Sequence, residues 1–488
     1  MENEKKRLGA REWIAIILIG FAGQLAWAIE NNYINMWVYS QTGNSEYITW
    51  MTMASAVAAA ITTFFMGALS DRLGSRKYFI AGGYTIWGVS VFAFALISRQ
   101  NISLSSVFAG SVSLWVGIWM VIVDCMMTFF GSTANDACFN AHVTDVTNKH
   151  NRGKVESFLS ILPLFATVVV LLVQGLCGAG SALTDAQKEA IVAAGQAADV
   201  NSISLEVSAA YLAKPWMVFF GIFGGITTVI GIVSFFLIPK ETIVPNKERG
   251  YMASVVYGFR PKVVKANPNF YIACLAFMAF NMAMDSFMPY FMVYFQNETD
   301  AQGLGLAGMN FYLIVGIIIV LASAIVVVTG IFMDKIGKRK LLIPAMGITC
   351  GALLMMFFAN PEFLSGKGMI ALLAVAGIFM MGGYLVGTAV LGAMLRDETP
   401  EGKAGLFQGV RIVLTVMIPM ILGSFVSSEV MKATGGTYIN EYGETAARPN
   451  NYMFLVALGF LLLAIIPCVW LVIRKKKEEK AAQQIEQQ

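Results

Sequence analysis

An eleven-residue charged segment, GALSDRLGSRK at residues 67–77, recurs in related form as GIFMDKIGKRK at residues 330–340. The copies start 263 residues apart in a chain of 488 residues, and each one joins two long apolar stretches. A charged hairpin repeated at matching positions of two halves is typical of membrane carriers built from internal repeats. The two hairpins therefore predict two similar helical bundles inside a membrane.

The composition indicates a membrane protein, because 57% of the residues are hydrophobic and only 13% are charged. This charged fraction is about half of the roughly 25% found in soluble domains. Twelve apolar stretches approach the roughly 20 residues that a helix needs to cross a bilayer. We predict an all-α integral membrane protein with twelve transmembrane helices at residues 12–40, 45–69, 78–98, 104–135, 156–178, 215–238, 268–295, 306–333, 340–359, 368–394, 404–429 and 451–473.

The predicted helices form two six-helix bundles, residues 1–238 and 268–488, joined by a cytoplasmic linker at 239–267. If both termini are cytoplasmic, 27 of the 34 Lys and Arg residues lie in cytoplasmic segments and 6 in outside segments. Positive charge is retained on the cytoplasmic side, so this orientation in the plasma membrane is favoured. The charged start is expected to lead into an uncleaved first helix, and the basic tail to anchor at lipid headgroups.

Each charged hairpin has an acid, Asp71 or Asp334, where one helix ends and the next begins. A carboxylate there accepts hydrogen bonds from free N–H groups and complements the helix dipole, and a glycine permits the tight reversal. A single loop of this kind would be explained as a positive connection without a mechanical role, but two at matching positions favour gating. The expected gating residues are Gly67, Asp71, Arg72, Gly74, Arg76, Asp334, Lys335, Gly337 and Arg339.

A second, weaker repeat follows the fourth and tenth predicted helices. Residues 145–147, DVT, come shortly before RGK at 152–154, and residues 397–399, DET, come shortly before GK at 402–403. Both sets lie on the predicted cytoplasmic side. Their matching positions strengthen the prediction of two related halves.

Four polar or aromatic residues of the first helix, Gln24, Trp27, Asn31 and Asn35, fall on one narrow stripe if the helix is regular. Polar side chains are costly in hydrocarbon, so the stripe should face a water-filled cavity. Glu30 lies about 100° from Asn31 around the helix and is expected to face a neighbouring helix. A polar seam between packed helices is the alternative, although so many amides exceed what one seam needs.

The other charges within apolar stretches are Asp124, Asp285 and Arg411, and Asp136 lies where the end of the fourth helix is ambiguous. A charge near the bilayer centre indicates a functional site by default. For Asp285 and Arg411 a structural ion pair is the alternative, and the sequence leaves both interpretations open. Trp119 is a candidate for stacking on the apolar face of a sugar, although tryptophan also anchors helices at membrane interfaces.

The pattern Gly-x-x-x-Asp-Arg/Lys-x-Gly-x-Arg-Lys, present at residues 67–77 and 330–340, resembles the signature loop of the major facilitator superfamily. Residues 24–30, QLAWAIE, look like the first helix of sucrose-type transporters, and residues 141–147, AHVTDVT, are similar to a segment after their fourth helix. The chain thus resembles the glycoside–pentoside–hexuronide:cation symporters. This resemblance implies alternating access and cation-coupled uptake of a mono- or disaccharide, with the charged loops closing the cytoplasmic side in one state.

The resemblance also implies roles for particular residues. Asp136 stands where melibiose-type members have a helix-four Asp at the sugar and cation site, and Gln24 where they have a sugar-binding Asp. Their two cation-binding Asp residues of helix two correspond here to Ala59 and Thr63, which favours H+ over Na+ as the coupling ion. Candidate cation sites are Glu30, Asp124, Asp136 and Asp285, and candidate solute contacts are Gln24, Trp27, Asn31, Asn35, Trp119, Asp136 and Arg411.

No motif of a nucleotide-hydrolysing enzyme, a zinc protease or a serine hydrolase is present, so we expect a non-enzymatic carrier without a cofactor. His142 and His150 are expected in a cytoplasmic loop, and the six cysteines show no metal or disulfide spacing. We also expect a monomer without a nucleic-acid partner. An exporter or a carrier of a drug, nucleoside or lipid headgroup is the main alternative, and a non-transporting sensor is the third.

Overall fold

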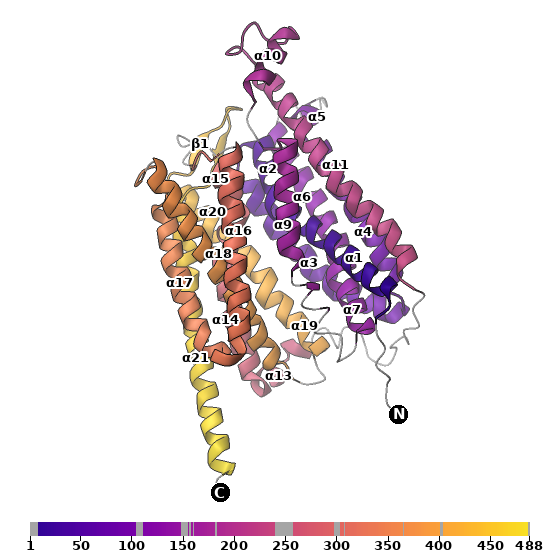
Figure 1. The fold of residues 1–488 in the computed structure, drawn as a ribbon, viewed down its shortest axis with the longest axis vertical. Coiled ribbons are helices and arrows are strands. Elements are labelled where there is room, and N and C mark those ends of the chain that lie inside the picture. Colours follow the sequence, from indigo (N-terminus) through magenta and orange to yellow (C-terminus); the bar gives the residue numbers. More distant parts are fainter. Residues whose placement is uncertain are drawn as a thin grey trace. The chain divides into compact units, whose positions relative to one another are not determined.

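The computed structural model is almost entirely helical (Figure 1). It describes residues 8–103, 111–147, 155, 158–159, 161–180, 183–239, 257–296, 303–306, 308–364, 366–400 and 404–486. Four sequence features lie outside these described residues: His150, the segments 152–154 and 402–403, and positions 240–256 of the predicted linker.

The chain divides into two compact units. Unit 1 comprises Met1–Lys247, Leu306–Tyr312 and Asn440–Ala446, and unit 2 comprises Glu248–Gly305, Leu313–Ile439 and Ala447–Gln488. The main division lies within the predicted linker. Two short segments of the second half of the sequence nevertheless belong to unit 1, and the sequence did not indicate this exchange.

Unit 1 contains the helical segments of the first half of the sequence, two of which are interrupted by π-helical turns. They are α1 (Ala10–Ala28), η1 (Ile29–Ile34), α2 (Asn35–Thr42), α3 (Glu46–Leu73), α4 (Lys77–Leu96), α5 (Arg99–Ser103), α6 (Val112–Gly131), η2 (Ser132–Phe139), α7 (Asn140–Val146), α9 (Leu162–Cys177), α10 (Asp185–Ala193) and α11 (Leu205–Leu237). The short helix α10 begins with a capping box, in which Thr184 accepts from the Gln187 N–H.

Unit 2 contains most of the second half. Its elements are the 3-10 turn η3 (Tyr257–Phe259), α13 (Pro261–Ala266), α14 (Pro268–Asp285), α15 (Met288–Gln296), α16 (Gly308–Ile336), α17 (Lys338–Phe358), α18 (Gly366–Asp397), α19 (Ala404–Ile412), the π-helical turn η4 (Val413–Met417), α20 (Ile418–Ala433), β1 (Thr437–Ile439), β2 (Thr445–Ala447) and α21 (Tyr452–Glu486). The first residues of α16 and the segment Asn440–Ala446 belong to unit 1.

Eleven helices within the described ranges are long and apolar enough to cross a membrane. Three of these spans include π-helical turns, for example Ala10–Thr42, which combines α1, η1 and α2. A further apolar helix, α9, has 16 residues and corresponds to the fifth predicted stretch. Each of the twelve predicted stretches therefore contains a helix, and the predicted all-α membrane fold is confirmed.

The fourth span differs from the prediction of residues 104–135. Its helix begins at Val112 and continues through η2 and α7 to Val146. Asp136 consequently lies inside a continuous helical segment, and His142 is buried in α7 rather than placed in a loop. The polar run after Gly131 suggested a helix end, but a π-helical turn accommodates these residues without breaking the helix.

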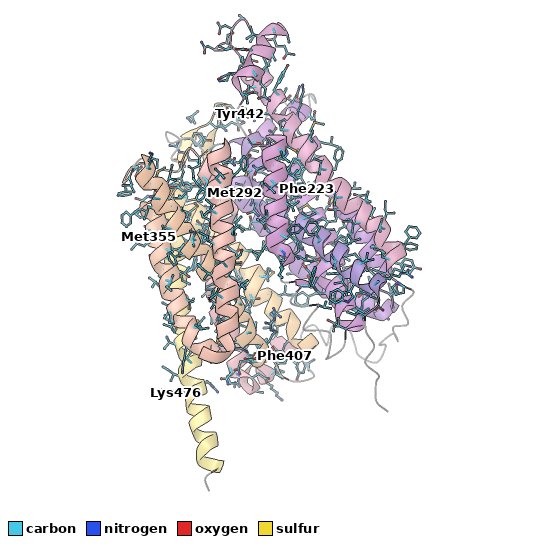
Figure 2. The ribbon with its side chains drawn as sticks, in the orientation of Figure 1. Phe223, Met292, Met355, Phe407, Tyr442 and Lys476 are labelled. Carbon is cyan, nitrogen blue, oxygen red and sulfur yellow. The ribbon has the colours of Figure 1, made fainter. Side chains whose placement is uncertain are left out.

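Small residues and aromatic side chains pack the helices within each unit. A Cβ added to Gly88 of α4 would lie 2.5 Å from the carbonyl oxygen of Gly224 in α11, so glycine allows these two backbones to approach closely. The ring of Phe223, also in α11, packs 5.1 Å from that of Phe219 (Figure 2). In unit 2, the rings of Phe407 and Phe270 lie 4.7 Å apart in an edge-to-face contact.

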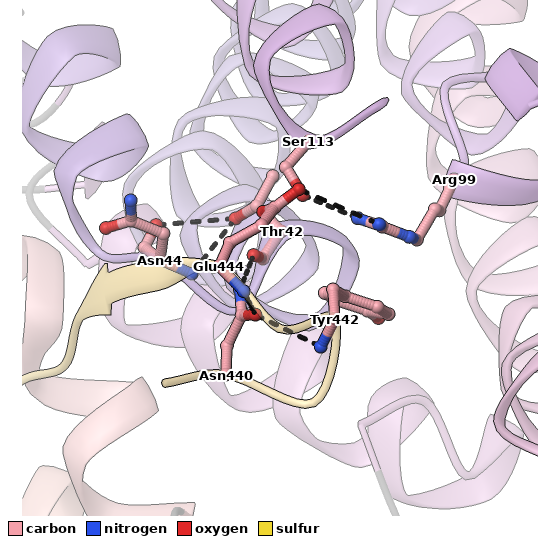
Figure 3. A network of polar contacts seen from close by, with 7 residues as sticks. All are labelled: Thr42, Asn44, Arg99, Ser113, Asn440, Tyr442 and Glu444. Atoms are coloured by element: carbon pink, nitrogen blue, oxygen red, sulfur yellow. Dashed lines mark hydrogen bonds and ion pairs between the residues drawn. The ribbon is translucent and has the colours of Figure 1, made fainter. Parts of the chain in front are cut away.

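The sequence did not predict the small hairpin, β1 and β2, that connects α20 to α21. We call its residues 440–446 the docked tip, because they belong to unit 1 (Figure 3). Asn440 is buried and donates from Nδ2 to the carbonyl oxygen of Thr42 at 3.1 Å. Gly43 has a positive φ of 61°, and a Cβ there would lie 3.2 Å from Asn440. Glycine thus provides both the turn and the space that Asn440 occupies.

Arg99 holds the other side of the docked tip (Figure 3). Its guanidinium lies 3.5 Å from the ring centroid of Tyr442 and 3.9 Å from Glu444, while its Nη1 donates to Ser113 at 2.5 Å. Burial and the nearby Glu441 raise the pKa of Tyr442 above its ordinary value. The phenol therefore stays neutral at physiological pH, and its ring remains a cation–π partner of Arg99.

Candidate functional site

A polar cavity of about 250 Å³ lies within unit 1. One carboxylate, three amides and an indole form its polar wall, and small and apolar residues form the remainder. The lining residues are Gly20, Gln24, Trp27, Asn135, Asp136, Phe139, Asn140, Leu159 and Leu162. The volume is slightly below the roughly 300–1,000 Å³ of drug-sized ligand sites, so the cavity suits a small solute.

Regular and π-helical turns together build this cavity. Gln24 and Trp27 lie three residues apart on α1 and therefore face the same side. Asn135 and Asp136 lie in η2, where the wider turn presents two consecutive polar side chains to the lining. The ring of Trp27 packs 5.0 Å from that of Trp87 on α4, which supports the indole from behind.

Hydrogen bonds orient the acidic residue of the cavity. The hydroxyl of Tyr84 donates to Asn135 Oδ1 at 2.8 Å, and Asn135 Nδ2 donates to Asp136 Oδ1 at 2.9 Å. Tyr84 is fully buried. The sequence analysis did not single out Tyr84, because an aromatic residue in an apolar helix gives no signal that distinguishes a packing role from a polar one.

Glu30 faces α3 and α6 rather than the cavity lining. Its Oε1 accepts from Thr128 Oγ1 at 2.8 Å, and Ser55 Oγ donates to the same oxygen at 3.3 Å. Asp124, one turn before Thr128, is also buried. Within the described part of the chain, Glu30 Oε2 and Asp124 Oδ1 have no hydrogen-bond partner. Ser55 and Thr128 were not predicted, since hydroxyl groups in helices commonly bond to their own backbone.

Three other predicted solute contacts do not line the cavity. The polar stripe of the first helix is interrupted, because η1 changes the angular spacing after Ala28. Asn31 is exposed, and the buried Asn35 donates to the carbonyl oxygen of Asn31. Trp119 is 40% exposed on α6, which fits an interface anchor better than a solute contact.

Asp285 and Arg411 lie in unit 2, in α14 and α19. No ion pair between them occurs among the described residues, so the alternative of a structural pair is not supported. Asn281 Nδ2 donates to the carbonyl oxygen of Thr415 in η4 at 2.6 Å. A π-helical turn therefore lies next to polar residues in unit 2, as it does in unit 1.

The charged hairpins contain the expected turns. Gly74 and Gly337 have positive φ values of 66° and 94°, which glycine adopts readily. Arg76 Nε lies 2.9 Å from Asp145 in α7, and Lys338 Nζ lies 2.7 Å from Asp397 in α18. In each unit a basic residue of the hairpin thus pairs with the acid of the weaker sequence repeat.

The remaining gating residues are less informative. Arg72 is exposed at the end of α3, and Gly67 lies in the same helix. The side chains of Asp71, Asp334, Lys335 and Arg339 lie outside the described part of the structure. The described residues also contain no group of three or more His, Cys, Asp or Glu side chains placed to bind a metal ion.

Known proteins share this fold. The profile of the Major Facilitator Superfamily matches residues 13–424 and 313–488. No curated protein matches the chain in sequence. Similar solved structures include a variant of the nucleoside transporter NupG, with 12% identity, 94% of this chain and 99% of that chain covered, and a TM-score of 0.66. The D-xylose-proton symporter follows with 14% identity, 93% and 97% coverage, and a TM-score of 0.64.

The inward-open xylose transporter XylE from E. coli is similarly related, with 14% identity, 93% and 95% coverage, and a TM-score of 0.60. These low identities show a shared fold, and the narrower resemblance to glycoside–pentoside–hexuronide:cation symporters stays a prediction. The family profile matches most of the chain and agrees with the helical architecture. The chain therefore belongs to the major facilitator superfamily, whose members are non-enzymatic, multi-pass membrane transporters.

Proposed function

We propose that this transporter is a cation-coupled symporter of a mono- or disaccharide that works by alternating access. We further propose that it acts as a monomer in the plasma membrane with both termini in the cytoplasm. The observation that carries the proposal is the cavity of unit 1, where the Trp27 indole meets three amides and Asp136.

The chemistry of this lining fits a sugar. A pyranose has an apolar face that can lie on an indole ring and hydroxyl groups around its edge that donate and accept hydrogen bonds. Gln24, Asn135 and Asn140 provide both donors and acceptors, and Asp136 provides a strong acceptor.

The proposed coupling site is the buried pair Glu30 and Asp124. The sequence contains no Lys or Arg between residues 12 and 71 or between residues 100 and 148. The helices that carry these acids therefore have no basic side chain to balance them within the apolar region. Buried carboxylates without a basic partner are costly, so an external cation must neutralise them, and we propose that this cation is H+.

Uptake by reconstituted protein tests this function. Purified protein in liposomes should accumulate a labelled neutral sugar, such as xylose or melibiose, when a proton gradient is imposed. Glu30→Gln should abolish accumulation but retain exchange of labelled for unlabelled sugar, because exchange needs no net movement of the cation. Ser90→Ala, which alters another buried hydroxyl, is a matched control.

The same assay separates the alternatives. Accumulation driven only by a sodium gradient would show that the coupling cation is Na+ and not H+. Uptake of uridine but not of sugars would favour a nucleoside carrier, for which the shared fold with NupG gives a reason to include this probe. No uptake of either solute in any gradient would contradict the proposal.

A further inference from the structure

Two hydrogen bonds connect Asp136, Asn135 and Tyr84 in one chain. An ionised carboxylate only accepts hydrogen bonds, so the NH2 group of Asn135 must face Asp136, at 2.9 Å. The amide oxygen of Asn135 then faces Tyr84, whose hydroxyl donates to it at 2.8 Å. The carboxylate thus sets which end of the Asn135 amide reaches it, and the Tyr84 hydroxyl holds the amide in that orientation.

The first helix leaves little space for any other arrangement. A Cβ added to Gly23 would lie 2.6 Å from Asn135 Oδ1 and 2.7 Å from the Tyr84 hydroxyl. Gly23 is buried, one residue before Gln24 of the cavity lining. The backbone of α1 thus lies close to the hydrogen bond between Tyr84 and Asn135 and restricts both side chains.

The charge of this cavity wall has one sign. Among the described lining residues, Asp136 is the only ionisable one, and none is Lys or Arg. In the sequence, the segments 12–71, 78–98, 100–148 and 155–187 also contain none. Two like charges about 4 Å apart repel strongly where water is partly excluded, and the described lining offers an anionic solute no compensating charge.

We propose that Tyr84 and Asn135 position Asp136 as an oriented acceptor, and that the cavity therefore selects neutral solutes rich in hydroxyl donors and rejects hexuronates and sugar phosphates. The identification of these solutes as sugars rests on the proposed function. The positioning role of Tyr84 does not depend on it.

Binding measurements on the purified full-length protein test both parts. The probes are melibiose, xylose, glucuronate and glucose 6-phosphate, measured by calorimetry. Wild-type protein should bind the two anions at least about 100-fold more weakly than the neutral sugars, as expected for a like charge in a poorly solvated site. Asp136→Asn should reduce this difference at least about tenfold by removing the repulsion.

The positioning role is tested with Tyr84→Phe and a matched control. Tyr84→Phe should weaken binding of neutral sugars about fivefold, the effect of one lost hydrogen bond, and Gly23→Ala should weaken it further. Tyr33→Phe removes the hydroxyl of another buried tyrosine that does not line the cavity, and its affinity should stay within about twofold of wild type. Equal affinities for Tyr84→Phe and Tyr33→Phe would overturn the positioning role.

A measurement without any solute separates this inference from the proposed function. Carbodiimides label carboxyl groups that they can reach, and the Asn135 amide covers Asp136 Oδ1. Labelling of Asp136, read by peptide mass spectrometry, should be several-fold faster in Tyr84→Phe than in wild type or Tyr33→Phe. Unchanged labelling would refute the positioning role even if sugars bind.

Tight glucuronate binding would refute the selectivity, and binding of uridine alone would refute only the choice of sugar.

Discussion

In each unit a basic residue of the charged hairpin pairs with a nearby aspartate, but the two pairs differ in their exposure to solvent. The Arg76 side chain is 11% exposed and that of Asp145 42%, whereas the Lys338 and Asp397 side chains are 30% and 56% exposed. A partly buried pair is costly to break, because the remaining charge loses its partner where water is scarce. An exposed pair contributes at most about 1 kcal/mol.

The two pairs use different positions of the repeat, because Arg76 is its tenth residue and Lys338 its ninth, so the hairpins share a pairing with a nearby acid but share neither its position nor its energy. Arginine in the first hairpin also forms a planar, persistently charged group suited to a buried pair, while lysine in the second is strongly hydrated. We infer that the pair of unit 1 acts as a structural anchor and that the pair of unit 2 can open and close at low cost.

The largest expected effect follows Arg76→Ala. This change removes a largely buried guanidinium together with its packing and its pair with Asp145, and should destabilise unit 1 by about 2 kcal/mol, lowering the thermal midpoint of the purified protein by several degrees. Arg72→Ala, an exposed basic residue of the same hairpin, is the control and should change the midpoint by less than one degree. Similar midpoints for the two variants would remove the proposed distinction between buried and exposed copies.

A double-mutant cycle measures each pair directly and should give an intermediate effect. Combining Arg76→Ala with Asp145→Ala should reveal a coupling energy of about 1–2 kcal/mol. The corresponding cycle of Lys338 and Asp397 should give about 0.5 kcal/mol or less. A larger coupling in unit 2 than in unit 1 would reverse the comparison.

Lys338→Ala alone should have a smaller effect, below about 1 kcal/mol. Salt screens exposed charges over about 3 Å at 1 M, so the difference from wild type should nearly vanish in 1 M NaCl. More of the Arg76→Ala difference should persist there, because the Arg76 side chain is only 11% exposed. Thermal midpoints measured at 0.1 M and 1 M NaCl would detect this contrast, and a salt-insensitive Lys338→Ala effect would contradict it.

The smallest effect concerns another arginine of unit 1, Arg99, whose partner is the neutral ring of Tyr442. The pKa of Tyr442 is raised in the folded state. Tyr442 therefore makes its full stabilising contribution below pH about 10, which is the pKa of a free tyrosine. This contribution is lost as the pH rises towards the raised value. Between pH 9 and 11 the thermal midpoint should fall slightly more for wild type than for Tyr442→Phe, and parallel curves would exclude this role.

Much of the architecture could be predicted from the sequence, because apolar length and repeated charge are local properties. The twelve helical stretches and the glycine turns at Gly74 and Gly337 follow from such signals. The continuation of the fourth helix through η2 could not be predicted, since a polar run can mark either a π-helical turn or a helix end, and packing around residues such as Asp136 decides between them.

The candidate site shows the same limit. Gln24, Trp27 and Asp136 were predicted as solute contacts, and the structure brings them to one cavity. The prediction for Asn31 and Asn35 assumed a regular helix, and η1 changes their direction. Tyr84 acts through a hydrogen bond between helices α4 and η2, and no spacing along one helix can reveal such a contact.

The docked tip means that neither half of the sequence encodes a complete unit. A fragment ending at Lys247 would contain Thr42, Gly43 and Arg99 but would lack Asn440 and Tyr442, which cover them in the intact chain. In two fragments divided in the linker and produced together, these contacts would form between separate chains. Division after residue 446 instead, with the last helix supplied separately, would leave the docking contacts on a single polypeptide.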